Sequence, residues 1–333
     1  MGRVRYSSCF VALAIAFAAL ACGGGAETTL VEPETEAQVA ASVEDGVRMI
    51  PVEDGRFKVW TKRVGSGDTK VLLLHGGPGA SHDYLKNFAD HLPAAGYELY
   101  LYDQLGSWRS DQPDDLSLWT VERFREEVET VRQALGLDDF VLIGQSWGGM
   151  LGIEYALKYQ DHLKGLVISN MVASIPRYVE GTKELRGQMD PGSLAIMEEH
   201  EAAGDYENPE YQELLIGELY SKHLCRLDPW PQGVMDTFEH LNHAIYNHMQ
   251  GPSEFEVTGT FKDWDRMADL PLIQVPTLLI VGRYDTMRVS DVEEMDELMP
   301  DSQLLICENG SHIANYDDEE AYFAGLLGFL AGL

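Results

Sequence analysis

Short apolar runs without polar alternation recur along the chain, each bounded by Gly, Asp or Pro. They are Val71–Leu74, Leu99–Tyr102, Phe140–Ile143, Leu166–Ser169 and Thr277–Val281. Such runs suit strands buried on both faces, because helices then cover each side of a parallel sheet. Helical patterns lie between or after them at Thr120–Leu135, Trp147–Tyr159 and Glu319–Leu333. The sequence therefore predicts an α/β fold with a mostly parallel, doubly wound sheet.

Two departures from this pattern suggest how the chain is divided. Asp54-Gly55 is a turn dipeptide between two partly alternating stretches, so the sheet is expected to begin with a hairpin over Val47–Val64. From about Ile175 to Met267 no buried strand is expected, and Glu, His, Tyr, Met and Leu recur at helical spacing. The expected division is a core of residues 46–174 and 268–333 and a helical cap of residues 175–267.

The N-terminus predicts export. Residues 1–22 resemble a secretory signal, with Arg3 and Arg5 before an apolar run that is too short to span a bilayer. The run ends in Ala-Leu-Ala-Cys, similar to a bacterial lipoprotein cleavage box, in which Cys22 becomes the lipidated first residue. The alternative is ordinary cleavage at an Ala-x-Ala site beside an incidental cysteine. Residues 23–45 are Gly-rich and then acidic, as expected of a flexible tether.

Charge and cysteine content narrow the possible partners. The chain has 55 acidic and 24 basic residues and a formal net charge of -31, so nucleic acid and anionic membranes would repel it. We therefore expect no nucleic-acid partner, and membrane contact only through the lipid anchor on the periplasmic or cell-surface side. Cys225 and Cys307 are expected to be buried free thiols, although spacing does not decide whether they pair.

A nucleophile motif stands between a predicted strand and a predicted helix, in Gly144-Gln-Ser146-Trp-Gly148-Gly149. This context fits the nucleophile elbow of an α/β hydrolase, in which a strained turn exposes the serine hydroxyl. Gly144 and Gly148 remove side chains that would clash at so sharp a turn. The helix that follows also directs its free N–H groups toward the site. Ser146 is therefore the predicted nucleophile.

A serine nucleophile needs a base and a group that orients the base, and in this fold the order is Ser, Asp or Glu, then His. Asp285 follows the Thr277–Val281 strand, and His312 follows the Ser302–Cys307 strand. Both are expected at the same sheet edge as Ser146. The other downstream histidines follow no strand and belong to the cap: His200, His223, His240, His243 and His248. Asp301 and Asp317 do not follow the penultimate strand.

The acyl-transfer transition state also needs fixed donors for its oxyanion. The Gly-Gly-Pro-Gly loop after His75 is of the backbone-donor kind, and it follows a strand of the same sheet. We assign the N–H groups of Gly77 and Trp147 as the two donors. No metal-ligand spacing of the H-E-x-x-H kind occurs, and no cofactor or metal is expected.

Four motifs together resemble the prolyl iminopeptidase family of α/β hydrolases, with a likeness from about residue 47 to the end. They are His75-Gly-Gly-Pro-Gly79, Asp103-Gln-Leu-Gly106 with Ser110 and Pro113, Gly144-Gln-Ser-Trp-Gly-Gly149, and Gly251-Pro-Ser-Glu254-Phe. The resemblance implies hydrolysis at an N-terminal residue, often proline, in short peptides, amides or arylamides. It also implies that a cap closes the site so that only a chain end enters.

Substrate contacts follow from the same resemblance. A cap glutamate binds the free α-amino group in this family, and Glu254 stands at the matching place. Many members carry Glu directly after the triad Asp, whereas this chain has Thr286, so one anionic contact is missing. A sub-group that acts on amino-acid amides such as prolinamide is similar at this point. Tyr246 and the Trp230-Pro231 pair are candidates for the proline-ring pocket, although aromatic residues in a helical cap more often pack in its core.

Two other functions remain open at this point. A carboxylesterase could use the same triad with a cap that accepts uncharged acyl groups, and a surface lipoprotein could keep the fold for binding alone. Epoxide hydrolases and dehalogenases share the fold and cap but use an Asp nucleophile, so Ser146 argues against both. The favoured interpretation is a serine aminopeptidase or amino-acid amidase whose partner is a small peptide or amide with a free N-terminal amine.

Overall fold

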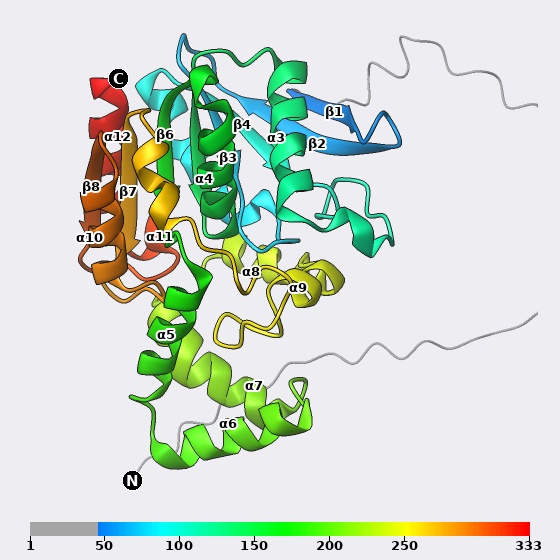
Figure 1. Ribbon diagram of the computed structural model, residues 1–333, viewed down its shortest axis with the longest axis vertical. Helices are drawn as coiled ribbons and strands as arrows, with labels where there is room; N and C mark the ends of the chain where they lie inside the picture. The colour runs from blue at the N-terminus through cyan, green and yellow to red at the C-terminus, as the bar shows by residue number, and fades with distance from the viewer. Residues whose placement is uncertain (1–45) are drawn as a thin grey trace, which may run out of the picture. The chain divides into compact units, whose positions relative to one another are not determined.

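The computed structural model describes residues 46–333, arranged around one eight-stranded sheet (Figure 1). The expected signal segment, the lipidation site Cys22 and the tether lie outside these residues. The strand order is β1-β2-β4-β3-β5-β6-β7-β8. The strands are β1 (Val47–Val52), β2 (Phe57–Val64), β3 (Lys70–Leu74), β4 (Glu98–Asp103), β5 (Phe140–Gln145), β6 (Leu163–Ser169), β7 (Thr277–Gly282) and β8 (Ser302–Cys307).

Strand direction divides the sheet into two parts. The hairpin of β1 and β2 is antiparallel, and β2 also pairs antiparallel with β4. From β4 onward, every neighbouring pair runs parallel. Parallel strands bring their carboxyl ends to one edge, where a doubly wound fold places its ligand sites. The predicted mixed, mostly parallel sheet is confirmed.

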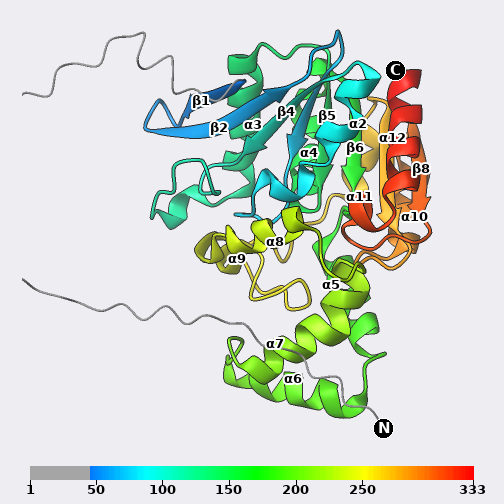
Figure 2. The same ribbon diagram turned by 180° about the vertical axis from the view of Figure 1, so that it is seen from behind.

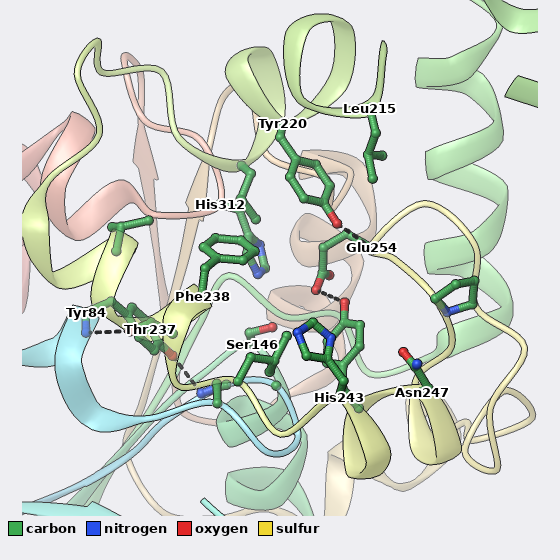
Figure 3. Close-up of a pocket in the computed structure, with 18 of the residues that line it drawn as sticks. Tyr84, Ser146, Leu215, Tyr220, Thr237, Phe238, His243, Asn247, Glu254 and His312 are labelled. Carbon is green, nitrogen blue, oxygen red and sulfur yellow. Dashed lines mark hydrogen bonds between the residues drawn. The ribbon is translucent and has the colours of Figure 1, made fainter. Parts of the chain in front are cut away.

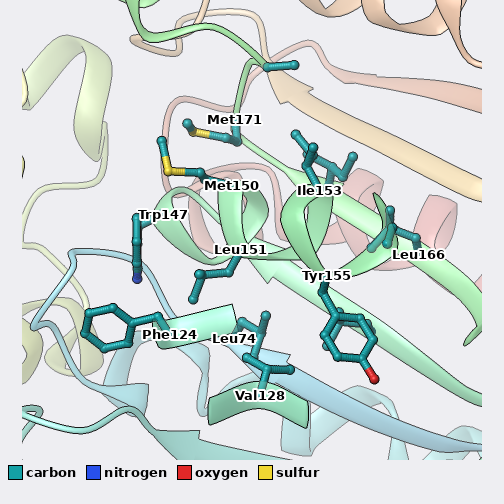
Figure 4. Close-up of a cluster of buried hydrophobic side chains, with 14 of the residues drawn as sticks. Leu74, Phe124, Val128, Trp147, Met150, Leu151, Ile153, Tyr155, Leu166 and Met171 are labelled. Carbon is teal, nitrogen blue, oxygen red and sulfur yellow. The ribbon is translucent and has the colours of Figure 1, made fainter. Parts of the chain in front are cut away.

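Helices cover both faces of the sheet. The helices α3 (Val121–Leu135), α4 (Trp147–Tyr159) and α10 (Val289–Leu298) lie on the face seen in Figure 1, whereas α2 (Phe88–His91) and α12 (Glu319–Gly332) lie on the face seen in Figure 2. The strand side chains are buried between these layers, which is why the runs are apolar throughout. Figure 4 shows the core between α4 and the sheet, where Leu151 lies near Leu74 and Met150 lies beside Met171. Cys225 and Cys307 are buried free thiols, as expected.

Between β6 and β7 the chain is helical, and these helices lie together beyond one end of the sheet (Figure 1). They are α5 (Ile175–Arg186), α6 (Pro191–Ala203), α7 (Pro209–Leu214), the π-helix η5 (Leu215–Leu224), α8 (Gln232–Glu239) and α9 (His243–Met249). A π-helix is rare and often occurs at a functional site. No helix within residues 46–333 has the length and apolar character needed to cross a membrane.

Short helices complete the connections around the sheet. They are the 3-10 helices η1 (His82–Leu85), η2 (Pro93–Ala95), η3 (Leu116–Leu118), η4 (Gln160–His162) and η6 (Met267–Leu272), and the single turn α11 (Ala314–Asp317). The loop after β3 leads into η1, and the loop after β8 leads into α11. Both connections therefore begin at the carboxyl edge of the sheet, where β3 is a direct neighbour of β5 and β8 is the edge strand beyond β6 and β7.

Candidate active site

Ser146 lies on the turn between β5 and α4 with φ 56° and ψ −127°, a strained conformation for a residue with a side chain. The turn needs glycine on both sides. A Cβ at position 144 would lie 2.0 Å from the Gly148 carbonyl oxygen, and a Cβ at position 148 would lie 2.1 Å from that of Leu74. The motif is therefore an elbow in the geometric sense, which presents a serine hydroxyl above the sheet.

His312 and Asp285 form a buried hydrogen-bonded pair, with 2.8 Å between His312 Nδ1 and Asp285 Oδ1. Because the Asp285 carboxylate is an acceptor, Nδ1 donates and Nε2 is left to take a proton. Burial by itself would lower the pKa of His312. The nearby negative charge of Asp285 and its hydrogen bond outweigh burial, with a further contribution from Glu254, so the pKa of His312 is raised above its ordinary value.

Asp285 is itself held by several donors. Asn170 Nδ2 donates to Asp285 Oδ2 at 2.6 Å and also to the Ser311 carbonyl at 3.1 Å. Asp285 Oδ1 accepts the Met287 N–H at 3.2 Å and the Thr286 hydroxyl at 3.2 Å. Asn170 was not among the predicted site residues, although its place directly after a buried strand at this edge was a usable signal.

Ser146 and His312 both line a cavity of about 410 Å³ between the sheet edge and the cap. Figure 3 shows the His312 ring pointing toward Ser146, with Phe238 beside it. This volume is within the range of small-molecule sites in proteins, about 300–1,000 Å³. The cap supplies most of the apolar lining, through Leu215, Tyr220, Leu224, Val234, Phe238 and Leu241.

The expected oxyanion donors converge on the same serine. Gly77 and Trp147 line a second, smaller cavity of about 10 Å³, together with Ser146. Trp147 is the first residue of α4, so its N–H has no acceptor one turn back in the helix. Gly77 has φ +112°, where a side chain would be strained, and its Cβ would lie 2.6 Å from the Ala80 nitrogen. Both residues border a cavity that Ser146 also lines, as the assignment of their N–H groups as oxyanion donors requires.

Buried hydrogen bonds fix the loop that carries Gly77. His75 Nδ1 lies 2.8 Å from the Gly76 carbonyl, and the Gln104 N–H donates to His75 Nε2 at 3.1 Å. Burial lowers the pKa of His75 and so keeps the ring neutral. A neutral ring can donate from Nδ1 to the Gly76 carbonyl and accept at Nε2 from Gln104. The Gln104 side chain donates to the His75 carbonyl at 3.0 Å and accepts from Trp147 Nε1 at 2.8 Å. His75 therefore supports the loop and is no second base.

Glu254 lines both cavities and is held by three cap tyrosines. Tyr246 donates to Glu254 Oε1 at 2.6 Å, and the Tyr178 hydroxyl lies 2.5 Å from the Glu254 carbonyl oxygen and 3.0 Å from Oε2. The Glu254 N–H donates to the Tyr220 hydroxyl at 3.3 Å. Burial and the Glu254 charge raise the pKa of Tyr246 well above its usual value, so its phenol stays a donor. The carboxylate is thereby oriented while one face remains open to the cavities (Figure 3).

Neither cavity has a Lys or Arg among its lining residues, whereas the larger one includes Glu207 and Glu254. A carboxylate without a basic neighbour in a partly desolvated site attracts an ammonium group more strongly than it would in water. Thr286 is buried beside His312 and lines neither cavity, so no second anionic group stands at that position. Within residues 46–333, no group of three or more His, Cys, Asp or Glu is placed to hold a metal ion.

The candidates Trp230 and Pro231 do not line either cavity. Trp230 Nε1 donates to the Cys225 carbonyl at 3.1 Å, and its ring stacks on Phe238 with 5.6 Å between centroids. Phe238, on which Trp230 stacks, does line the larger cavity. Trp230 therefore packs behind a residue that lines the cavity. This agrees with the alternative that aromatic residues of the cap pack in its core.

The smaller cavity, which shares Gly77, Ser146 and Glu254 with the larger one, is otherwise lined mostly by apolar side chains. Its lining includes Met150, Met171, Ile175, Phe261 and Met287. Methionine side chains are flexible and fill irregular gaps, so this region can adapt to a small apolar group. Glu254 lies at its border with the larger cavity, which places a carboxylate beside an apolar recess.

Comparison with known proteins agrees with this geometry. The family model described as alpha/beta hydrolase fold matches residues 69–319. A proline iminopeptidase of Flavobacterium johnsoniae is 48% identical over 288 residues, covering 85% of this chain and 97% of the relative. A proline iminopeptidase of Saccharolobus solfataricus is 39% identical over 291 residues, covering 87% of this chain and 93% of the relative.

Solved structures show the same likeness. VinJ superposes with a TM-score of 0.83 and 35% identity, covering 87% of this chain and 99% of VinJ. The proline iminopeptidase of Mycobacterium smegmatis superposes with a TM-score of 0.79 and 32% identity, covering 86% of this chain and 98% of that protein. The chain therefore belongs to the proline iminopeptidase family of α/β hydrolases.

Proposed function

We propose that this protein is a serine aminopeptidase that releases an N-terminal residue, with proline favoured, from short peptides or amino-acid amides. One observation carries the proposal. Glu254, a carboxylate held by tyrosines, lines the same cavity as Ser146 and His312. An esterase for uncharged acyl groups has no use for an oriented carboxylate there, whereas a free α-ammonium group needs one.

The reaction follows from the roles of the three residues. The Ser146 hydroxyl attacks the carbonyl carbon of the N-terminal residue while His312 Nε2 takes its proton. Negative charge on the carbonyl oxygen is met by the N–H groups of Gly77 and Trp147. The protonated His312 then gives its proton to the leaving amine, and the C–N bond breaks. Water, deprotonated by His312, hydrolyses the acyl-enzyme and restores Ser146.

Substrate placement uses both cavities. The α-ammonium group of the substrate binds Glu254, and the proline ring enters the apolar recess formed by Met150, Met287 and their neighbours. The recess of about 10 Å³ holds only a water-sized group as it stands, so its flexible methionine side chains move apart to admit the ring. The leaving group extends into the larger cavity, which has room for a peptide or arylamide portion. Because Thr286 offers no second carboxylate, amine recognition rests on Glu254.

The test compares Glu254→Gln with Glu207→Gln, the exposed carboxylate of the same cavity. Substrates are a prolyl arylamide with a free amine and a short-chain nitrophenyl ester without one. Glu254→Gln should lower kcat/KM for the arylamide at least about 30-fold, since loss of one partner of a shielded charge pair costs about 2 kcal/mol or more. Ester turnover should hardly change, and Glu207→Gln should preserve both activities. Equal effects of Glu254→Gln on arylamide and ester would refute the role.

The other open functions give distinct results in the wild-type protein. Fast ester turnover with no arylamide turnover would favour a carboxylesterase on the same triad. Failure of a fluorophosphonate probe to label wild-type protein, with Ser146→Ala as the unlabelled reference, would favour a binding protein. The aminopeptidase proposal requires arylamide turnover and labelling that Ser146→Ala abolishes.

We further propose that the protein is an exported bacterial lipoprotein, anchored through a lipid on Cys22. Support comes from the basic start and the apolar run of residues 1–22, and from the Ala-Leu-Ala-Cys sequence at its end. A lipid on Cys22 would hold the enzyme at the membrane through residues 23–45. Peptides outside the cytoplasm are then the substrate pool.

A further inference from the structure

The Tyr84 hydroxyl joins two loops of the site. It accepts the Gly76 N–H at 2.6 Å and donates to Gln145 Oε1 at 2.6 Å. Gly76 is the residue before the oxyanion donor Gly77, and Gln145 is the residue before the nucleophile Ser146. One buried hydroxyl thus connects the loop after β3 to the elbow after β5.

The Gln145 side chain extends this connection to a third loop. Its Nε2 donates to the His312 carbonyl at 2.8 Å, while its Oε1 accepts from Tyr84. Each side-chain atom of the amide is therefore used, and the assignment of oxygen and nitrogen is fixed by these partners. The oxyanion loop, the elbow and the histidine loop are joined through two buried side chains.

Close packing at Gly76 shows how tightly these groups converge. A Cβ at this position would lie 3.0 Å from the Tyr84 hydroxyl, 3.1 Å from Ser146 Cβ and 3.3 Å from Gln145 Oε1. Tyr84 is also held at its backbone: its N–H donates to the Thr237 hydroxyl at 3.1 Å, and its carbonyl accepts from Asn315 Nδ2 at 3.0 Å. The hydroxyl is therefore a fixed point.

We propose that Tyr84 and Gln145 are positioning residues, which set the distances among the oxyanion donor, the nucleophile and the base by joining their three loops. The inference rests on the proposed function for its substrate and on the serine triad for its chemistry. Neither residue takes a proton in the reaction. Burial raises the pKa of Tyr84 far above neutrality, so its hydroxyl keeps the same donor role at every working pH.

Loss of this connection should slow the chemistry more than binding. Without the Tyr84 hydroxyl, the Gly76 N–H and Gln145 Oε1 lose their buried partner, and the loops shift to find others. Displacement of reacting groups by about 1 Å can reduce rate about 100-fold. Tyr84 and Gln145 also line the larger cavity, but Tyr84→Phe keeps the aromatic ring and leaves Glu254 and the apolar recess untouched, so ground-state binding should persist.

The experiment compares Tyr84→Phe with Tyr155→Phe, which removes another buried tyrosine hydroxyl, one that donates to Glu129 at 2.8 Å away from both cavities. For a prolyl arylamide, Tyr84→Phe should lower kcat about 100-fold with KM within about twofold of wild type. The Ki of pyrrolidine-2-boronic acid, which forms a tetrahedral adduct with the serine, should rise in parallel. Tyr155→Phe should lower Tm about as much as Tyr84→Phe does, because each removes one buried hydroxyl, but it should leave kcat unchanged.

A double mutant shows whether Tyr84 and Gln145 act together or whether each variant disturbs packing independently. Gln145→Leu removes the same connection from its other end, so Tyr84→Phe with Gln145→Leu should be about as slow as the slower single variant. Multiplicative loss in the double mutant would overturn the inference, as would a Tyr84→Phe enzyme with wild-type kcat and boronate Ki. A loss confined to KM would overturn it too.

A second readout tests the positioning role even if the proposed aminopeptidase function is wrong. If wild-type protein does not cleave the arylamide, the rate of fluorophosphonate inactivation replaces kcat, because that reaction needs only the triad and oxyanion donors. Tyr84→Phe should slow inactivation about 100-fold while the final labelled fraction stays complete, which shows that the variant is folded. Unchanged inactivation rates would refute the positioning role whatever the substrate.

Discussion

His312 is a buried imidazole whose environment acts on its protonation in two directions. Burial favours the neutral ring, which is the form that can act as a base. The Asp285 carboxylate, 2.8 Å from Nδ1, favours the charged ring that forms during the reaction, and the net result is a raised pKa. The environment of His312 thus stabilises the imidazolium that forms during the reaction. A higher pH is then needed for the ring to start neutral and act as a base.

This balance predicts the pH dependence of catalysis. Only neutral His312 can accept the Ser146 proton, so kcat/KM should fall as pH drops through the raised pKa, above the ordinary value of about 6.5. Asp285→Asn removes the main cause of the rise. The acid limb should then move to lower pH, and kcat at the plateau should fall on the order of 10⁴-fold because the ring loses its orienting partner. A kcat/KM profile between pH 5 and pH 9 measures both effects.

Asp301→Asn is the matched control, because Asp301 is an exposed carboxylate on the loop before β8. Its profile should overlay that of the wild type. An acid limb that stays in place in Asp285→Asn would mean that another group controls the protonation of the base.

At the scale of elements, the elbow between β5 and α4 depends on close contact between backbone atoms. Gly144 and Gly148 face each other across the turn, and Gly148 also packs against the end of β3. The neighbouring strand and helix are held by buried packing in the core of Figure 4, so they have little freedom to move apart. The strain at Ser146 is therefore maintained by the surrounding layers.

Gly148→Ala should disrupt the elbow, because its Cβ would lie 2.1 Å from the Leu74 carbonyl oxygen. We expect urea unfolding to show a loss of about 1–3 kcal/mol, typical of overpacking in a core, and fluorophosphonate labelling to be abolished. Gly328→Ala in α12 is the control, since nothing lies within 4 Å of its Cβ. That variant should be stabilised by about 0.4–1 kcal/mol with normal labelling. A fully active Gly148→Ala protein would contradict the steric account.

The elements and the order of the site residues could be predicted because each strand is a local apolar run, and parallel strands end at one edge. Together with the Gly-x-Ser-x-Gly motif and the chain order Ser, Asp, His, that rule was enough to nominate Ser146, Asp285 and His312. Tyr84 and Gln145 could not be assigned a role in this way. Tyr84 lies 61 residues from its partner Gln145, and Gln145 lies 167 residues from His312. Such contacts depend on how loops meet, which no local pattern encodes.

For the molecule as a whole, the described residues contain every group to which we assign a role in the proposed reaction. Sheet, cap and both cavities lie within residues 46–333, and the nucleophile, base and carboxylates all come from this part. Residues 23–45 and the proposed lipid on Cys22 would therefore affect where the enzyme works, and not how fast it works. Location and catalysis should be separable by mutation.

Cys22→Ser tests this separation in a bacterial host that processes lipoproteins. The wild-type protein should incorporate labelled palmitate and partition into detergent, and mass spectrometry should find a lipid-modified Cys22 at the mature N-terminus. Cys22→Ser should lose the label and the detergent partitioning, with kcat/KM for the prolyl arylamide unchanged. Cys225→Ser, a buried thiol in the cap, should keep the label. A wild-type N-terminus that begins after Cys22, or an unmodified Cys22, would show ordinary secretion in place of anchoring.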